Sequence, residues 1–116
     1  MAKIVYLMVV FLVVAHMMVK PGESLKCSDT TTMASLCSPY TRGQLPDPSS
    51  ECCTAVKEIR ESTNTTETRR QLCNCVQQNA KRIPGALLTR FDDLPLKCGL
   101  PVIYSAQPTF DCNSVN

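Results

Sequence analysis

The residues of this chain whose type and spacing could support chemistry are its cysteines. They are Cys27, Cys37, Cys52, Cys53, Cys73, Cys75, Cys98 and Cys112. An even number of cysteines in a short chain with an export signal is typical of a disulfide framework. Structural zinc sites instead prefer cysteine pairs separated by about two to four residues. We therefore expect four disulfides and no metal site.

Two groups of closely spaced cysteines require helices to direct their side chains to different partners. Cys52 and Cys53 are adjacent, and Cys73 and Cys75 are separated by Asn74. On a helix, neighbouring side chains point about 100° apart, and side chains two positions apart differ by about 200°. Each group can therefore join its helix to two other segments. Spacing alone leaves the pairing of the eight cysteines open.

The first two helices are expected between polar caps and loop residues. Ser28 or Asp29 suits the N-cap of the first helix, and Gly43 suits its end. Asp47 followed by Pro48 predicts the start of the second helix. The inner stripe of this second helix is expected to be Cys52, Cys53, Val56 and Ile59, while Lys57, Glu58, Arg60 and Glu61 are expected to face water.

Two more helices and an irregular tail complete the expected fold. Thr65 or Thr66 caps a third helix that continues to about Lys81, and residues 86–94 form a short fourth helix. Prolines downstream, Pro101 and Pro108, disfavour helix in the C-terminal tail. The predicted fold is all-α, with four short helices and an irregular tail stapled by four disulfides.

Residues 1–24 have the features of a secretory signal peptide, which leaves residues 25–116 as one domain. Lys3 gives a positive start, and the apolar stretch 4–19 is shorter than the roughly 20 residues that span a bilayer. Gly22 and Ser24 are small residues suited to cleavage before residue 25. Val13 and Ala15 offer an alternative cut before residue 16. We expect a secreted protein.

Charge and composition exclude several functional classes. The formal net charge is +2, and loss of Lys3, Lys20 and Glu23 with the leader lowers it to +1. This charge does not suit a nucleic-acid-binding protein or a membrane-disrupting cation. The single histidine, His16, lies in the leader, so the domain has none for a catalytic triad. Asp92 and its neighbouring carboxylate read as a solvated turn. We expect no enzymatic activity and no cofactor.

The expected core is small, and this has a physical consequence. The domain contains no tryptophan, and a core of this size supplies only about 3–5 kcal/mol. Each native disulfide typically adds about 2–4 kcal/mol, chiefly through the unfolded state. A chain held by cross-links is less obliged to fill its interior, so it can keep a hollow.

The cysteine spacing resembles that of the plant non-specific lipid-transfer proteins, type 1 branch, over the whole domain. The matching gaps contain 9, 19, 22 and 13 residues, and the polar Asn74 also fits that branch. Further matching pieces are Cys37-Ser38-Pro39-Tyr40, Arg69-Arg70 and Leu96-Lys97-Cys98-Gly99. The pattern is shared in outline with seed storage albumins and cereal amylase and trypsin inhibitors.

The resemblance implies a disulfide pairing, a ligand class and a mode of action. The implied pairs are Cys27–Cys75, Cys37–Cys52, Cys53–Cys98 and Cys73–Cys112. The implied site is a tunnel-like apolar cavity between the helices and the C-terminal coil, which would hold the acyl chain of a fatty acid, lysolipid or phospholipid. The implied protein is a monomeric carrier that contacts membrane surfaces transiently.

Candidates for the lining of such a cavity come from the inner faces of the expected helices and from the tail. They are Val56, Ile59, Leu72, Val76, Ala80, Ile83, Leu87, Val102 and Ile103. The same side chains could instead pack a solid core.

Two short family motifs are implied to lie at the cavity mouth. The first, Thr/Ser-x-x-Asp-Arg/Lys, reads Thr65-Thr66-Glu67-Thr68-Arg69 here, so Thr68 replaces the aspartate. The second, Pro-Tyr-x-Ile-Ser, retains only Tyr104. The resemblance implies that Arg69 pairs with a lipid carboxylate or phosphate, for which its fork is suited. The Tyr104 hydroxyl would donate a second bond.

The sequence also leaves open a second function and a site of glycosylation. A secreted protease or amylase inhibitor could use the same scaffold through an exposed loop, and the best loop here is residues 44–50. Asn64-Thr65-Thr66 is an N-glycosylation sequon in an expected polar linker.

Overall fold

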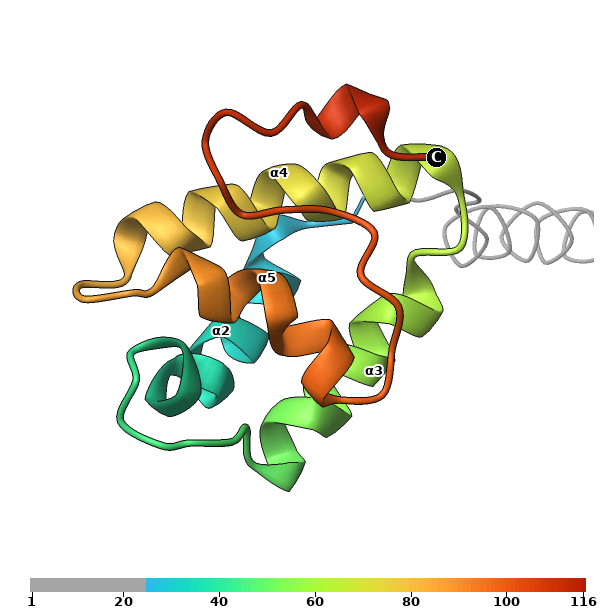
Figure 1. Ribbon diagram of the computed structural model, residues 1–116. Helices are drawn as coiled ribbons and strands as arrows, with labels where there is room; N and C mark the ends of the chain where they lie inside the picture. Colours follow the sequence, from blue (N-terminus) through green and yellow to red (C-terminus); the bar gives the residue numbers. More distant parts are fainter. Residues whose placement is uncertain (1–24) are drawn as a thin grey trace, which may run out of the picture.

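Four helices and a long C-terminal segment make up residues 25–116, the part of the chain that the computed structural model describes (Figure 1). The elements are α2 (Cys27–Thr41), α3 (Ser50–Ser62), α4 (Thr66–Arg82), α5 (Leu88–Lys97) and a 3-10 helix, η1 (Cys112–Ser114). No strand occurs among these residues, and the predicted all-α class is confirmed. The predicted signal peptide, 1–24, lies outside the described residues. Within the described range, no helix has the length and apolarity to cross a membrane.

The start of α2 differs from the prediction. The helix begins at Cys27, and the preceding Lys26 offers no side-chain cap. Ser28 and Asp29 therefore lie inside the first turn and are not N-caps. The Asp29 carboxylate still lies at the positive end of the helix dipole, where a negative charge is favourable. The disulfide at Cys27 fixes this end of the helix, so a side-chain cap is less necessary.

The start of α3 is also later than predicted. Ser49 is the N-cap, because its hydroxyl oxygen accepts a 3.1 Å hydrogen bond from the backbone N–H of Cys52. Asp47 lies in the preceding loop, where its carboxylate is 3.6 Å from Nζ of Lys97. Two good capping residues lay two positions apart, and the one nearer the cysteines is used.

The start of α4 confirms Thr65 as its cap. The Thr65 hydroxyl accepts from the Thr68 N–H, and the Thr68 hydroxyl accepts from the Thr65 N–H, both at 3.1 Å. This reciprocal arrangement is a capping box. Thr68, which stands where the family motif has aspartate, is therefore a structural residue with only 5% of its surface exposed.

The fourth helix lies further along the chain than predicted. It runs from Leu88 to Lys97 and continues through Pro95, so the expectation that it ends at Leu94 is wrong. A proline in the last turn removes only one helical hydrogen bond. The carbonyl of Pro95 in turn accepts from the N–H of Leu100 at 2.8 Å, which closes the helix end beside Gly99 at φ 82°.

Four disulfides staple these elements, and they are the pairs that the resemblance implied. They are Cys27–Cys75, Cys37–Cys52, Cys53–Cys98 and Cys73–Cys112. The first two tie α2 to α4 and to α3. The other two anchor the C-terminal segment, which passes α3, crosses α4 and turns back along it (Figure 1).

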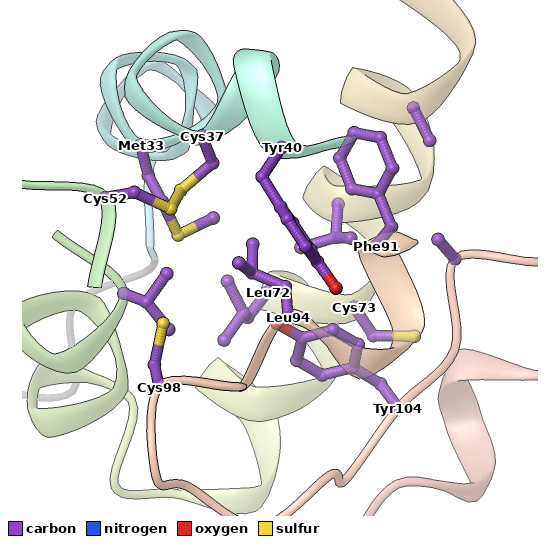
Figure 2. Packing of buried hydrophobic residues seen from close by; sticks show 14 of the residues in the cluster. Met33, Cys37, Tyr40, Cys52, Leu72, Cys73, Phe91, Leu94, Cys98 and Tyr104 are labelled. Carbon is purple, nitrogen blue, oxygen red and sulfur yellow. A yellow bond between two sulfur atoms is a disulfide. The ribbon is translucent and has the colours of Figure 1, made fainter. Parts of the chain in front are cut away.

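A contiguous cluster of buried apolar side chains lies between the helices. Tyr40, Leu72, Phe91, Leu94 and Tyr104 enter it from α2, α4, α5 and the C-terminal segment (Figure 2). Tyr40 and Tyr104 are 2% and 7% exposed, so both rings are part of the core.

The predicted lining residues divide into three groups. Val56, Leu72, Val76 and Ala80 are buried members of this cluster, and Ile59, Ile83 and Ile103 are partly buried against it. Leu87 and Val102 are about half exposed and lie outside it. Val102 is exposed beside the partly buried Ile103, in a segment that forms no regular secondary structure. Leu87 precedes α5, where its backbone N–H donates to the carbonyl of Thr41.

Candidate functional site

The candidate site is a groove beside the C-terminal segment. It has a volume of about 620 Å³ and lies between the end of α3, the link to α4 and residues 100–103. We call it the mouth groove. Its lining consists of Lys57, Arg60, Glu61, Thr63, Asn64, Arg69, Leu100, Pro101 and Ile103. One side is thus apolar, and the other carries three cations and one carboxylate.

Arg60 occupies the centre of this arrangement. Its Nη1 donates a 2.8 Å hydrogen bond to the carbonyl oxygen of Pro101. Its guanidinium carbon lies 5.9 Å from the centre of the Tyr104 ring, within cation–π range. The prediction that Arg60 simply faces water is therefore wrong. The sequence could have indicated this contact, because Arg60 lies one helical turn after Val56, at the edge of the inner stripe of the helix.

Arg69 also lines the mouth groove, as the resemblance implied. Its Nη1 donates a 3.2 Å hydrogen bond to the carbonyl oxygen of Asn116, and Nε of Arg70 donates to the carbonyl oxygen of Val115 at 2.8 Å. The two arginines therefore hold the end of the C-terminal segment against α4. Part of the bonding capacity of Arg69 is used within the protein.

Tyr104 is buried and is not one of the residues that line the groove. Burial raises the pKa of its hydroxyl, the positive charge of Arg60 opposes this rise, and Asp92 adds to it. The phenol is therefore protonated near neutral pH. The Tyr104 ring contacts the Arg60 guanidinium at cation–π distance, and its hydroxyl does not line the groove.

Asp92 and Asp93 are structural carboxylates, contrary to the expectation of a solvated turn. Asp92 accepts from the Ala106 N–H at 2.6 Å and from the Ser105 hydroxyl at 2.9 Å. Asp93 accepts from the Tyr40 hydroxyl at 2.6 Å. Two adjacent α5 residues thus hold the C-terminal segment on one side and α2 on the other. The hydrogen-bond partners of both carboxylates are distant in sequence, so no local sequence pattern could have predicted these contacts.

Among the other predicted features, Ile83 and the loop 44–50 lie away from the groove, whereas Asn64 lies beside it. Ile83 lines a separate cavity of about 300 Å³ between α2 and the end of α4. The loop 44–50 is tied to α5, because Nη1 of Arg90 donates to the carbonyl oxygen of Leu45 at 2.6 Å. Asn64 is exposed and lies on the groove rim. Among residues 25–116, no cluster of potential metal ligands is present.

Comparison with known proteins gives one consistent family. The model described as the protease inhibitor/seed storage/LTP family matches residues 27–112. Non-specific lipid-transfer protein P3 of Vitis is 37% identical over 92 residues, which cover 79% of this chain and all of that protein. A non-specific lipid-transfer protein of Anethum graveolens is 38% identical over 114 residues, covering 96% of this chain and 93% of the relative.

Solved structures agree with this assignment. Barley non-specific lipid transfer protein 1, in complex with a lysophosphatidylcholine, superimposes with a TM-score of 0.72 at 29% identity, covering 79% of this chain and 100% of the barley chain. A wheat non-specific transfer protein complexed with two molecules of phospholipid gives a TM-score of 0.69 at 27% identity, covering 78% and 100%.

Proposed function

Because this chain belongs to the protease inhibitor/seed storage/LTP family, and within it to the non-specific lipid-transfer proteins, we propose that it binds and carries fatty acids, lysolipids or phospholipids, whose acyl chains enter through the mouth groove. The observation that supports this site is the pairing of an apolar wall, formed by Leu100, Pro101 and Ile103, with a cationic wall. A lipid has the same two parts, an alkyl chain and a polar head.

Burial of the alkyl chain provides the binding free energy. Each Å² of apolar surface removed from water contributes about 25 cal/mol. The head group stays at the groove rim beside water, so neutral head groups are poorly distinguished from one another. Cations at the rim favour anionic heads.

The acyl chain enters the apolar cluster by displacing partly buried side chains. Ile59 and Ile103 are partly buried and pack against the cluster, and Ile103 also lines the groove. Val56 and Leu72, both predicted as lining residues, are buried members of the same cluster. The disulfides keep the helices in place, so these side chains can move without unfolding the domain. The barley and wheat relatives are solved in complex with lipids, which supports lipid binding by this chain.

We also propose that the protein is processed on secretion and acts as a monomer. Residues 1–24 are removed on secretion, and the whole of the Vitis relative aligns with 92 residues, the number that follows residue 24. The mature protein acts as a monomeric, non-enzymatic carrier that collects lipids at membrane surfaces. Val102, which is exposed next to the groove residue Pro101, supplies apolar contact with the membrane.

Displacement of a fluorescent fatty acid from the oxidised protein tests this function. We expect unlabelled lysophosphatidylcholine to displace the probe, and reduction of the disulfides to abolish binding. Trypsin and α-amylase assays on the same sample test the inhibitor alternative through the loop 44–50. Absence of probe binding together with tight inhibition of either enzyme would refute the carrier function.

A further inference from the structure

A second cavity, which the proposed lipid carriage does not use, lies between α2 and the end of α4. It has a volume of about 300 Å³ and is lined from residues 31–42 and from residues 79–84. We call it the α2/α4 cavity. It shares no lining residue with the mouth groove. Small-molecule sites have volumes of about 300–1,000 Å³, so this cavity suits a single ring better than a long acyl chain.

Two arginines supply the charge of the α2/α4 cavity. Arg42 is the C-cap residue of α2, and Arg82 is the last residue of α4, so each lies at the negative end of a helix dipole. No carboxylate lines the cavity, and the one ion pair among residues 25–116 joins Lys97 to Asp47. The arginine side chains that donate hydrogen bonds within that range are four others. The forked donors of Arg42 and Arg82 are therefore available to an external carboxylate.

Hydroxyl groups of α2 give the same cavity hydrogen-bond acceptors. The Thr31 hydroxyl donates to the carbonyl oxygen of Cys27 at 3.1 Å, and the Ser38 hydroxyl donates to that of Ser35 at 3.0 Å. Each hydroxyl has one hydrogen, so both hydrogens are engaged within the helix. The two hydroxyl oxygens can still accept.

Asn79 is the buried polar residue of the lining, with 6% of its surface exposed. Its amide orientation is fixed by Thr30, whose hydroxyl donates to the carbonyl oxygen of Cys27 at 2.6 Å and so accepts from Nδ2 of Asn79 at 2.9 Å. The remaining atom, Oδ1, has no described partner within residues 25–116 and is not a fully buried atom. It can therefore accept a hydrogen bond from a ligand in the cavity.

A small apolar surface, formed by Ala34, Ile83 and Pro84, completes the lining. The cavity thus combines two guanidinium donors, several acceptors and an apolar patch. A saturated ring with hydroxyl groups has apolar C–H faces that pack on such a patch, and its hydroxyls match the acceptors. The two cations require that the ring also carry a negative charge.

We propose that the α2/α4 cavity binds an acidic sugar, a hexuronate ring whose carboxylate pairs with Arg42 and Arg82. The ring hydroxyls donate to Thr31, Ser38 and Asn79. This site is independent of lipid carriage, because it shares no residue with the mouth groove. A hexuronate occurs both as a free sugar and as a unit of a polysaccharide, and the experiment distinguishes the two sources.

The test titrates the oxidised protein with galacturonate, galactose and acetate while the backbone amides are followed by NMR. Galactose has the ring without the carboxylate, and acetate has the carboxylate without the ring. We expect galacturonate to bind about ten times more tightly than either, because only it uses the cations and the acceptors together. The largest shifts should fall in residues 34–38 and 79–83.

Two variants and a matched control assign the charge recognition. Arg42→Gln and Arg82→Gln should each weaken galacturonate binding about tenfold and leave galactose binding unchanged. Lys81→Gln is the control, because Lys81 is an exposed cation in the same last turn of α4 but does not line the cavity. It should change the affinity for galacturonate less than twofold. Displacement of a fluorescent fatty acid should be the same in all three variants.

The outcomes that would overturn the inference leave lipid carriage intact. Equal weakening by Lys81→Gln and Arg82→Gln would assign binding to the net charge. Equal affinities for galacturonate and acetate would mean that the cavity attracts anions without recognising a sugar. Competition between galacturonate and the fatty acid would place the sugar in the mouth groove. If galacturonate binds as expected, tighter binding of its linear trimer identifies a polysaccharide unit as the ligand, and equal binding identifies the free sugar.

Discussion

The Tyr40 hydroxyl of α2 donates a 2.6 Å hydrogen bond to Oδ1 of Asp93 on α5. Arg90 strengthens the same junction, because its guanidinium carbon lies 4.7 Å from the Tyr40 ring centre and its Nη1 donates to the Tyr40 carbonyl oxygen at 3.1 Å. None of the four disulfides joins α2 directly to α5. This polar junction therefore links two helices that no disulfide joins directly.

The junction predicts a loss of stability at alkaline pH. Burial, and then the hydrogen bond to Asp93, raise the pKa of Tyr40 from 10.0 to about 12. Below pH 10 the phenol is neutral in the folded and unfolded states, so its stabilising contribution is fully present. Between about pH 10 and 12 only the unfolded phenol ionises, and the free energy of unfolding falls. Denaturant unfolding at several pH values measures this fall.

Tyr40→Phe is the control for the alkaline prediction. It should be less stable at neutral pH by about 1–3 kcal/mol, because Asp93 loses a charge-assisted bond. It should also lose less stability between pH 10 and 12 than the native protein. Equal slopes for the two proteins in that range would contradict the assignment to Tyr40.

Asp92 is predicted to control the position of the C-terminal segment. Its carboxylate accepts from the Ala106 N–H and the Ser105 hydroxyl, so Asp92→Ala leaves both donors without that acceptor. We expect a loss of about 1–3 kcal/mol and faster hydrogen exchange at the Ala106 amide. Asp47→Ala is the matched control, because the Asp47–Lys97 pair is exposed and contributes about 0–1 kcal/mol. Unchanged exchange at Ala106 would contradict this role.

The Cys73–Cys112 bond is predicted to matter for ligand binding as well as for stability. It closes a loop with a sequence separation of 39 and fixes the end of the segment that lies over α4. Replacing both cysteines with alanine should cost about 2–4 kcal/mol and should also weaken fatty-acid binding, since hydrogen bonds such as those of Arg69, Arg70 and Gln77 would then hold this part of the segment without the covalent link. Binding is measured below the unfolding temperature of the variant. Full retention of affinity there would show that this cross-link serves stability only.

The sequence was sufficient for the number and approximate position of the helices, because these depend on local patterns. The cysteine pairing came from the resemblance to a family, since the spacing alone left it open. The site depended on contacts that no local pattern encodes. Arg60 is on the helix face expected to meet water, and only the return of the chain at Pro101 covers it. Asp92 likewise has its partners in the tail. Val102 was predicted to line the cavity together with Ile103 but is about half exposed, because the irregular segment 100–106 has no repeating pattern from which its inward side chains could be predicted.

Thr68 illustrates how a departure from a family motif can be interpreted only in the structure. As a sequence feature it is a missing carboxylate beside Arg69. In the structure it completes the capping box with Thr65 and is nearly buried. The substitution therefore changes the charge balance near the groove while still capping the helix.

Glycosylation at Asn64 is predicted to restrict access to the mouth groove. Asn64 is exposed, belongs to the sequon Asn64-Thr65-Thr66 and lines the groove rim. A glycan there would stand beside the entrance without displacing any buried group. Protein secreted from a eukaryotic host and carrying the glycan should therefore bind a fluorescent fatty acid more slowly than Asn64→Gln from the same host. The thermal unfolding midpoints of the two should be nearly equal, because Asn64 makes no described side-chain hydrogen bond within residues 25–116. Enzymatic removal of the glycan from the native protein provides the control and should restore the faster association. Equal association rates before and after its removal would show that the glycan points away from the groove.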